Sequence, residues 1–92
     1  MGPQRPKSIE EAVKVLLTEL SEKDRQIIRI MAEDQLSSLH LSLGNHIRNG
    51  FGLWGSNVEL LKACSPDGVL RDADNASMVL IKALWWKLQP VQ

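Results

Sequence analysis

Apolar residues recur at intervals of three and four along most of the chain, which is the spacing of one face of an α-helix. The clearest example follows Ser8 and consists of Ile9, Ala12, Val13, Leu16, Leu17 and Leu20. Ser8 and Glu11 have the spacing of a capping box, in which a hydroxyl and a carboxylate each accept a backbone N–H at the helix start. The pattern therefore predicts a first helix directly after Ser8. No segment shows the strict alternation that is typical of a β-strand.

Two more helices are predicted in the first half of the chain. Ser21 is a suitable N-cap for a second helix with Ile27, Ile28, Ile30 and Met31 as its apolar positions. Asp34 can cap a third helix, which we expect to continue as one element to the Asn49-Gly50 pair, a pair suited to a left-handed C-cap. The apolar face of this third helix would consist of Leu36, Leu39, His40, Leu43 and Ile47.

The second half begins with a loop, Phe51–Gly55, whose glycines favour turns although its other residues are apolar. Ser56 and Glu59 repeat the capping-box spacing and predict a short helix with Leu60, Leu61 and Cys64 on one side. A last helix, capped by Asp72 or Asp74, should run to about Gln89. It is apolar over more than half of its circumference, so we expect it at the centre of the molecule.

These elements predict one all-α domain of four or five short helices in an irregular orthogonal bundle, covering residues 8–89. Residues 1–7 contain two prolines and a glycine, and we expect them to be a flexible leader, with 90–92 as a tail. A chain of 92 residues can close only one modest core.

The charges are balanced overall, with 11 Lys and Arg against 11 Asp and Glu. This balance argues against binding of a nucleic acid, because that requires uncompensated positive charge on one face. It permits self-association. The single cysteine excludes a disulfide framework and favours a reducing compartment, so we expect a cytoplasmic protein. No apolar run is long enough to span a membrane.

The distribution of charge is more informative than its sum. Between Gln35 and Val58 the only residue with a full charge is Arg48. A lone cation in an apolar stretch needs a partner, and Asp72 or Asp74 is the candidate. Two interpretations remain open for such a pair. It could be a buried clamp that fixes the glycine loop, or part of a pocket for an anionic ligand or peptide.

No group of residues has the spacing of a catalytic or metal site. His40 and His46 are six residues apart and would point to opposite sides of a helix. Cys64 lies on an apolar face, so we expect it to be a small core residue and not a nucleophile. The segment Asp72–Asn75 begins like a calcium loop but lacks the required glycine and the final glutamate. We therefore expect no enzymatic activity, no metal and no cofactor.

Tryptophans are the remaining signal. For Trp54, in the glycine loop, we favour a role as a plug over the core, with an exposed binding anchor as the alternative. Trp85 and Trp86 are about 100° apart on a helix, so we expect one in the core and the other at its margin or against a partner.

One alternative is a DNA-binding regulator at residues 20–47. Leu20–Arg29 resembles the opening helix of the helix-turn-helix in sigma factors and response regulators. A recognition helix with basic or amide side chains should follow. The following segment has only Arg48 as a charged residue, which argues against nucleic acid as a partner.

A second resemblance covers much more of the chain. The pairs Leu39-His40 and Leu43-Gly44, the run Ile47–Trp54, and Asn57, Leu60-Leu61 and Cys64 resemble a family of small bacterial domains of unknown function. The similarity continues through Asp74, Ala76-Ser77 and Leu84-Trp85, and so extends over about residues 20–88. Asn75 and Trp86 depart from the family pattern.

This resemblance implies no activity, because the function of the family is not established. It implies that five signature residues belong together: His40, Arg48, Asn49, Trp54 and Asn57. We expect them to be binding residues of a noncatalytic protein-binding or regulatory module that uses the loop around Trp54. The expected partner is another protein or a second copy of the chain.

Overall fold

The structure is a computed structural model that describes residues 5–65 and 72–90, and the regular elements in these ranges are all helices. In chain order they are α1 (Ile9–Glu19), α2 (Glu22–Ile30), the 3₁₀-helix η1 (Glu33–Leu39), α3 (Leu43–Gly50), α4 (Val58–Ala63) and α5 (Ala73–Leu88). The predicted all-α fold is confirmed. The described part of the chain has five α-helices, with η1 in addition to the expected number.

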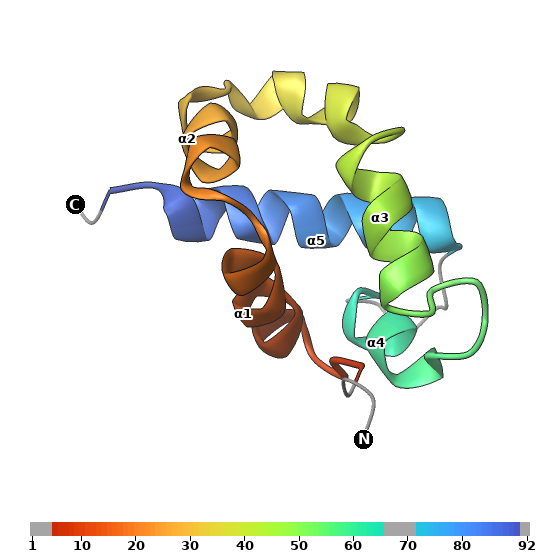
Figure 1. Ribbon diagram of the computed structural model, residues 1–92. Helices are drawn as coiled ribbons and strands as arrows, with labels where there is room; N and C mark the ends of the chain where they lie inside the picture. The colour runs from red at the N-terminus through yellow and green to blue at the C-terminus, as the bar shows by residue number, and fades with distance from the viewer. Residues whose placement is uncertain (1–4, 66–71, 91–92) are drawn as a thin grey trace.

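Helix α5 is the centre of the bundle, as its apolar circumference predicts. It crosses the molecule, and α1, α2, η1 and α3 all pack against it (Figure 1). Its residues Ala76, Leu80 and Leu84 are fully buried. Trp85 is partly buried and donates its indole N–H to the Met31 carbonyl at 2.8 Å, whereas Trp86 is exposed. Trp85 thus packs against the core without being one of its buried residues, and Trp86 lies at the margin.

Four of the helices have an N-cap residue whose side-chain oxygen accepts a backbone N–H of the first turn. Ser8 accepts the Glu11 N–H at 3.1 Å and Ser21 accepts the Asp24 N–H at 3.1 Å, as predicted. Of the two candidates for α5, Asp72 is the N-cap and accepts the Asn75 N–H at 2.9 Å. The Glu11 carboxylate accepts from the Lys7 N–H at 3.2 Å.

The predicted capping of α4 by Ser56 is wrong. The N-cap is Asn57, whose Oδ1 accepts the Leu60 N–H at 3.3 Å. Ser56 is engaged elsewhere, because its hydroxyl donates to the Gly52 carbonyl at 3.2 Å and accepts from Arg5 at 2.7 Å.

The expected third helix is two elements, and its predicted N-cap is also wrong. Ala32 is the N-cap of η1, and its N–H donates to Gln35 Oε1 at 2.8 Å. The helix is interrupted between η1 and α3, where the His40 carbonyl accepts from the Arg48 side chain. Ser38 and Ser42 also donate their hydroxyls to the backbone carbonyls three residues earlier, which competes with helical bonding. Helix α3 ends at Gly50 as expected, but the left-handed glycines are Gly52 and Gly55.

Residues 5–7 of the expected flexible leader lie against the domain. Pro6 is buried, and its carbonyl accepts from Asn57 Nδ2 at 2.8 Å. Lys7 forms an ion pair of 3.5 Å with Glu59. Residues 1–4 of the leader and 91–92 of the tail lie outside the described residues.

Cys64 lies in the core, as predicted. Its side chain is buried beside Leu60 and Leu61, and this burial raises the pKa of the thiol from 9.0 to about 11. At neutral pH the sulfur is therefore protonated and unreactive. None of the described helices is both long enough and apolar enough to span a bilayer.

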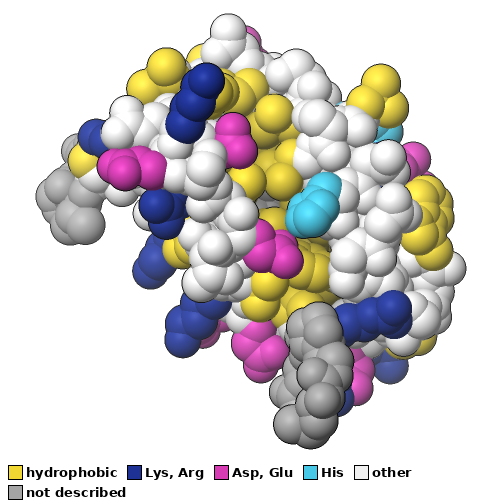
Figure 2. Space-filling view, in the orientation of Figure 1, with side chains coloured by type: hydrophobic (Ala, Val, Ile, Leu, Met, Phe, Trp, Pro, Cys, Tyr) yellow, Lys and Arg dark blue, Asp and Glu magenta, His cyan; other side chains and the backbone are white. Residues whose placement is uncertain are grey.

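The outer surface combines apolar and charged areas. On the face shown in Figure 2, apolar side chains reach the surface between α1, α2 and α3, with charged side chains around them. A hollow of about 250 Å³ is lined there by Leu20, Ile27, Leu39 and Leu43 among others. His46 of α3 lies 3.4 Å from Glu19 of α1 and links these two helices at the surface.

Candidate functional site

Arg48 is the centre of the candidate site. It lies in the last turn of α3 and is only 4% exposed. Its Nη1 donates to Ser77 Oγ on α5 at 3.0 Å, and its Nη2 donates to the His40 carbonyl at 3.1 Å. The guanidinium therefore joins α3, the turn after η1 and the first turns of α5.

The carboxylate beside Arg48 is Asp74, one of the two predicted partners. Asp74 Oδ1 lies 3.5 Å from Arg48 Nε. Nε has no hydrogen-bond acceptor among the described residues, so this contact is an ion pair without a direct hydrogen bond. The Asp74 side chain is 57% exposed and remains hydrated. The cation is thus held by two uncharged oxygens and compensated by a solvated carboxylate.

Room for the guanidinium depends on Gly44, one turn earlier on α3. A Cβ at this position would lie 2.9 Å from Arg48 Nη1 and 3.4 Å from the Leu39 carbonyl oxygen. A glycine inside a helix costs conformational entropy. Here it permits the close approach of a charged side chain to the helix.

Trp54 lies on the outer side of the same arginine. Its ring centroid is 5.8 Å from Arg48 Cζ, which is a cation–π distance. Its indole N–H donates to Asn49 Oδ1 at 2.8 Å. The side chain is 65% exposed, so our preferred interpretation of Trp54 as a plug over the core is wrong. Phe51 and Leu53 occupy the core in its place.

The loop itself is closed by backbone contacts. The Leu53 N–H donates to the Arg48 carbonyl at 3.0 Å, and the Asn57 N–H donates to the Gly52 carbonyl at 2.9 Å. Gly52 has a φ of +71°, a backbone conformation that favours glycine. This turn places Phe51 and Leu53 inward and leaves Trp54 outward.

His40 borders the site through its ring as well as its carbonyl. Its Nε2 lies 3.9 Å from Asp74 Oδ1, and the ring is part-exposed. His46 has another carboxylate beside it, since its Nε2 lies 3.4 Å from Glu19 Oε1. In the part of the chain that the structure describes, no three His, Cys, Asp or Glu side chains are arranged to hold a metal ion.

The five predicted site residues form two groups. His40, Arg48, Asn49 and Trp54 come together, joined by Asp74 and by Ser77. Ser77 is a site residue that sequence reasoning missed; the available signal was a polar residue on the apolar face of the last helix, between Ala76 and Leu80.

Asn57 is in the second group, at the other end of the loop. Its Nδ2 donates to the Pro6 carbonyl at 2.8 Å and to the Phe51 carbonyl at 2.9 Å, while its Oδ1 caps α4. Asn57 is buried and holds the loop to the N-terminal segment. Both groups therefore hold one loop, Phe51–Asn57, from its two ends.

This arrangement can present an aromatic ring in a fixed position at the surface. The Ser77 hydroxyl is engaged within the site, because it accepts from Arg48 Nη1 at 3.0 Å and donates to the Asp74 carbonyl at 2.9 Å. Helix α3 offers no arginine to a DNA groove, because Arg48 is its only arginine and is buried.

Comparison with known proteins gives one positive result. No curated protein and no solved structure matches the chain. A family model matches residues 5–88, which includes the Arg5–Lys7 segment, the site and α5. The prediction of a small family without an established function is thereby confirmed. The chain belongs to the family described as a domain of unknown function (DUF6794).

Proposed function

We propose that this domain is a noncatalytic protein-binding or regulatory module, with Trp54 as its anchor side chain. The observation that carries the proposal is that Trp54 is both exposed and held in place. It is 65% exposed, yet its indole N–H is bonded to Asn49 and its ring lies over Arg48. Tryptophan is among the residues that contribute most of the binding energy in protein interfaces.

The fixed ring favours binding for an entropic reason. An exposed side chain that is free to rotate loses rotamer freedom when a partner covers it, which costs about 0.5 to 1.5 kcal/mol. The Asn49 contact and the Arg48 contact impose much of this order before binding. The loop below the ring is also fixed, because Asn57 and Arg48 hold its two ends.

The surroundings of the ring favour a protein surface as partner. Arg48, Asp74 and His40 form a compensated group beside Trp54, so this edge of the site has no strong excess of either charge. A partner would place an apolar surface on the ring and polar groups near Asp74. Interfaces of this kind combine an aromatic centre with a polar rim.

The test is capture of partners from the source cell with wild-type protein, Trp54→Ala and Trp86→Ala. Trp86 is a matched control, since it is 61% exposed and lies near the opposite end of α5 from the Trp54 loop (Figure 1). We expect Trp54→Ala to lose a protein that both other forms retain.

The affinity for that protein is then measured by titration with purified components. Loss of the anchor should weaken binding about 30-fold, the equivalent of about 2 kcal/mol. Asn49→Ala, which frees the indole but keeps the ring, should weaken it by a smaller factor. Equal binding by Trp54→Ala and wild type would contradict the proposal.

A further inference from the structure

The outward face of α5 carries a feature that the Trp54 site does not use. Asn75, Val79, Lys82 and Trp86 follow one another at intervals of four, three and four, so they lie on one line of the helix. The buried residues of α5 are on the opposite side. Trp86, at one end of this line, is 61% exposed.

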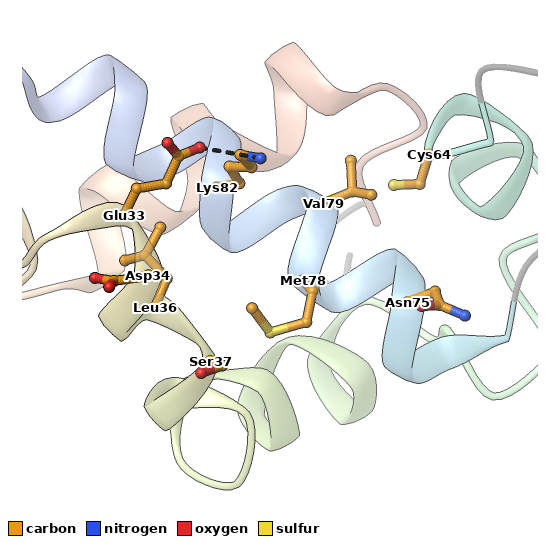
Figure 3. Close-up of a pocket in the computed structure, with 9 residues that line it drawn as sticks. All are labelled: Glu33, Asp34, Leu36, Ser37, Cys64, Asn75, Met78, Val79 and Lys82. Atoms are coloured by element: carbon orange, nitrogen blue, oxygen red, sulfur yellow. Dashed lines mark ion pairs between the residues drawn. The ribbon is translucent and has the colours of Figure 1, made fainter.

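A cavity of about 540 Å³ opens on the same line, toward the other end of α5. Figure 3 shows Met78 and Val79 of α5, with Leu36 of η1 and Cys64, directly after α4, on the two sides of the space. The Lys82–Glu33 ion pair, at 3.0 Å, crosses its edge. The lining is mainly apolar, and the volume is in the range of sites that take a ring-sized group.

The spacing between Trp86 and the cavity along α5 permits a symmetric contact between two copies. Trp86 lies seven residues after Val79, which corresponds to two turns and about 10 Å along the helix axis. If two copies of α5 pack antiparallel about a two-fold axis near Lys82, Trp86 of each copy comes opposite Val79 of the partner subunit. One rotation therefore fills both cavities, as an isologous interface requires.

We propose that this face of α5 forms a homodimer in which Trp86 of each subunit enters the cavity of the other. The conformations of Trp85 and Trp86 agree with this. Trp85 is directed inward and bonded to the Met31 carbonyl, and the two rings meet edge to face at 5.2 Å. Trp86 is thereby left on the outer face of the helix.

The charges on this face are compatible with contact between two copies. Lys82 is compensated by Glu33 in its own chain. Around the two-fold axis the two ion pairs come together, with each Lys82 near Glu33 of the partner subunit, so that opposite charges alternate. The formal net charge of the chain is zero, which removes long-range repulsion between copies.

The experiment measures the mass of the full-length protein in solution by sedimentation equilibrium over the micromolar to millimolar range. We expect a concentration-dependent monomer–dimer equilibrium in the wild type. Trp86→Ala should weaken dimerisation at least ~10-fold, as expected for loss of a central interface tryptophan. Trp54→Ala should leave it unchanged. Circular dichroism verifies that both variants are folded.

A charge exchange tests the position of the axis. Lys82→Glu alone would bring four carboxylates together at the axis and should weaken the dimer. Combined with Glu33→Lys, it restores both kinds of ion pair and should restore the dimer. A wild type that is monomeric throughout, or a dimer that Trp86→Ala does not weaken, overturns the proposal. Neither result affects the proposed role of Trp54.

Discussion

Substitution of Arg48 by alanine is the most direct test of how the site is held together. Arg48 is 4% exposed, and its guanidinium donates one hydrogen bond to Ser77 and one to the His40 carbonyl. The substitution removes both bonds and leaves the His40 carbonyl without this donor. It also removes the side-chain stem from the contact between α3 and α5, where it packs as apolar surface.

The expected loss follows from these contacts. Hydrogen bonds from a charged group contribute about 1.5 to 3 kcal/mol each. We use the lower value, because the Asp74 carboxylate is 57% exposed and stays hydrated when its partner is removed. Two bonds at this value give about 3 kcal/mol, a large part of the roughly 5 to 15 kcal/mol that stabilise a typical domain.

Urea unfolding followed by circular dichroism measures this difference as a shift of the midpoint at constant slope. The melting temperature should fall by roughly 12 to 24 °C. Arg29→Ala is the control, since the Arg29 side chain is exposed on α2 and the hydrogen bond from Gln89 Nε2 goes to the Arg29 backbone carbonyl, which the substitution keeps. Its free energy of unfolding should change by less than about 0.5 kcal/mol.

Asp74→Asn removes the ion pair and keeps the hydrogen bonds from Arg48 to Ser77 and to the His40 carbonyl, so it measures the contribution of the ion pair alone. It should cost no more than about 1 kcal/mol, because an exposed carboxylate contributes little. Our reasoning would be refuted by an Arg48→Ala protein that loses less than ~1 kcal/mol, since one buried and one part-buried charge-assisted bond should together contribute more than this. It would also be refuted if Asp74→Asn destabilised the protein as much as Arg48→Ala.

Four other substitutions probe the site, its loop and the core. Gly44→Ala should destabilise the protein by about 1 to 2 kcal/mol despite better helix propensity, since the new Cβ would meet Arg48 Nη1 at 2.9 Å. Gly50→Ala, with nothing within 4 Å, should stabilise it slightly in the same urea assay, and the reverse order would contradict the geometry. Asn57→Asp should cost about 2 to 4 kcal/mol in that assay, because a second oxygen would face the two carbonyls that Nδ2 now binds; a neutral result would exclude these bonds. Because burial raises the pKa of Cys64 from 9.0 to about 11, wild-type stability should decline between these two pH values as the unfolded thiol ionises first, and Cys64→Ala should lack this part of the decline. A thiol reagent at pH 8 should label the native protein only after urea is added.

Helices could be predicted from the sequence where the apolar spacing and the N-cap residue indicate the same start. This applies to the helices that begin after Ser8 and Ser21, and the apolar circumference of α5 likewise predicted its central position. The third helix is the exception. Its apolar spacing is continuous, but the His40 carbonyl accepts from Arg48 eight residues later. A tertiary bond of this kind leaves no trace in local periodicity.

The candidate site was readable only in part. A lone charge in an apolar stretch correctly indicated that Arg48 needs a partner, and Asp74 was one of two candidates. The main acceptors, Ser77 and a backbone carbonyl, could not be predicted, because any residue supplies a carbonyl and spacing does not show which one is free. The hydrogen bond from Asn57 to the Pro6 carbonyl could not be predicted for the same reason, and it joins residues 51 positions apart.

The orientation of Trp54 shows a different limit of sequence reasoning. Phe51, Leu53 and Trp54 are all apolar, and composition alone does not say which of them the loop places inward. The turn is set by the left-handed Gly52 and by the bond from Leu53 N–H to the Arg48 carbonyl. Together they direct the first two residues into the core and the tryptophan outward.

The same turn connects stability with binding at this site. Arg48 holds α3 to α5 with its Nη1, accepts from the Leu53 N–H of the loop with its carbonyl, and has its Cζ 5.8 Å from the Trp54 ring centroid. A loss of binding in Arg48→Ala would therefore not identify a contact residue. Trp54 can be removed with little cost to the core, because Phe51 and Leu53 fill it. Trp54 is therefore the position where a substitution can abolish binding while the urea midpoint of unfolding stays constant. For this reason the binding proposal depends on the tryptophan and not on the arginine.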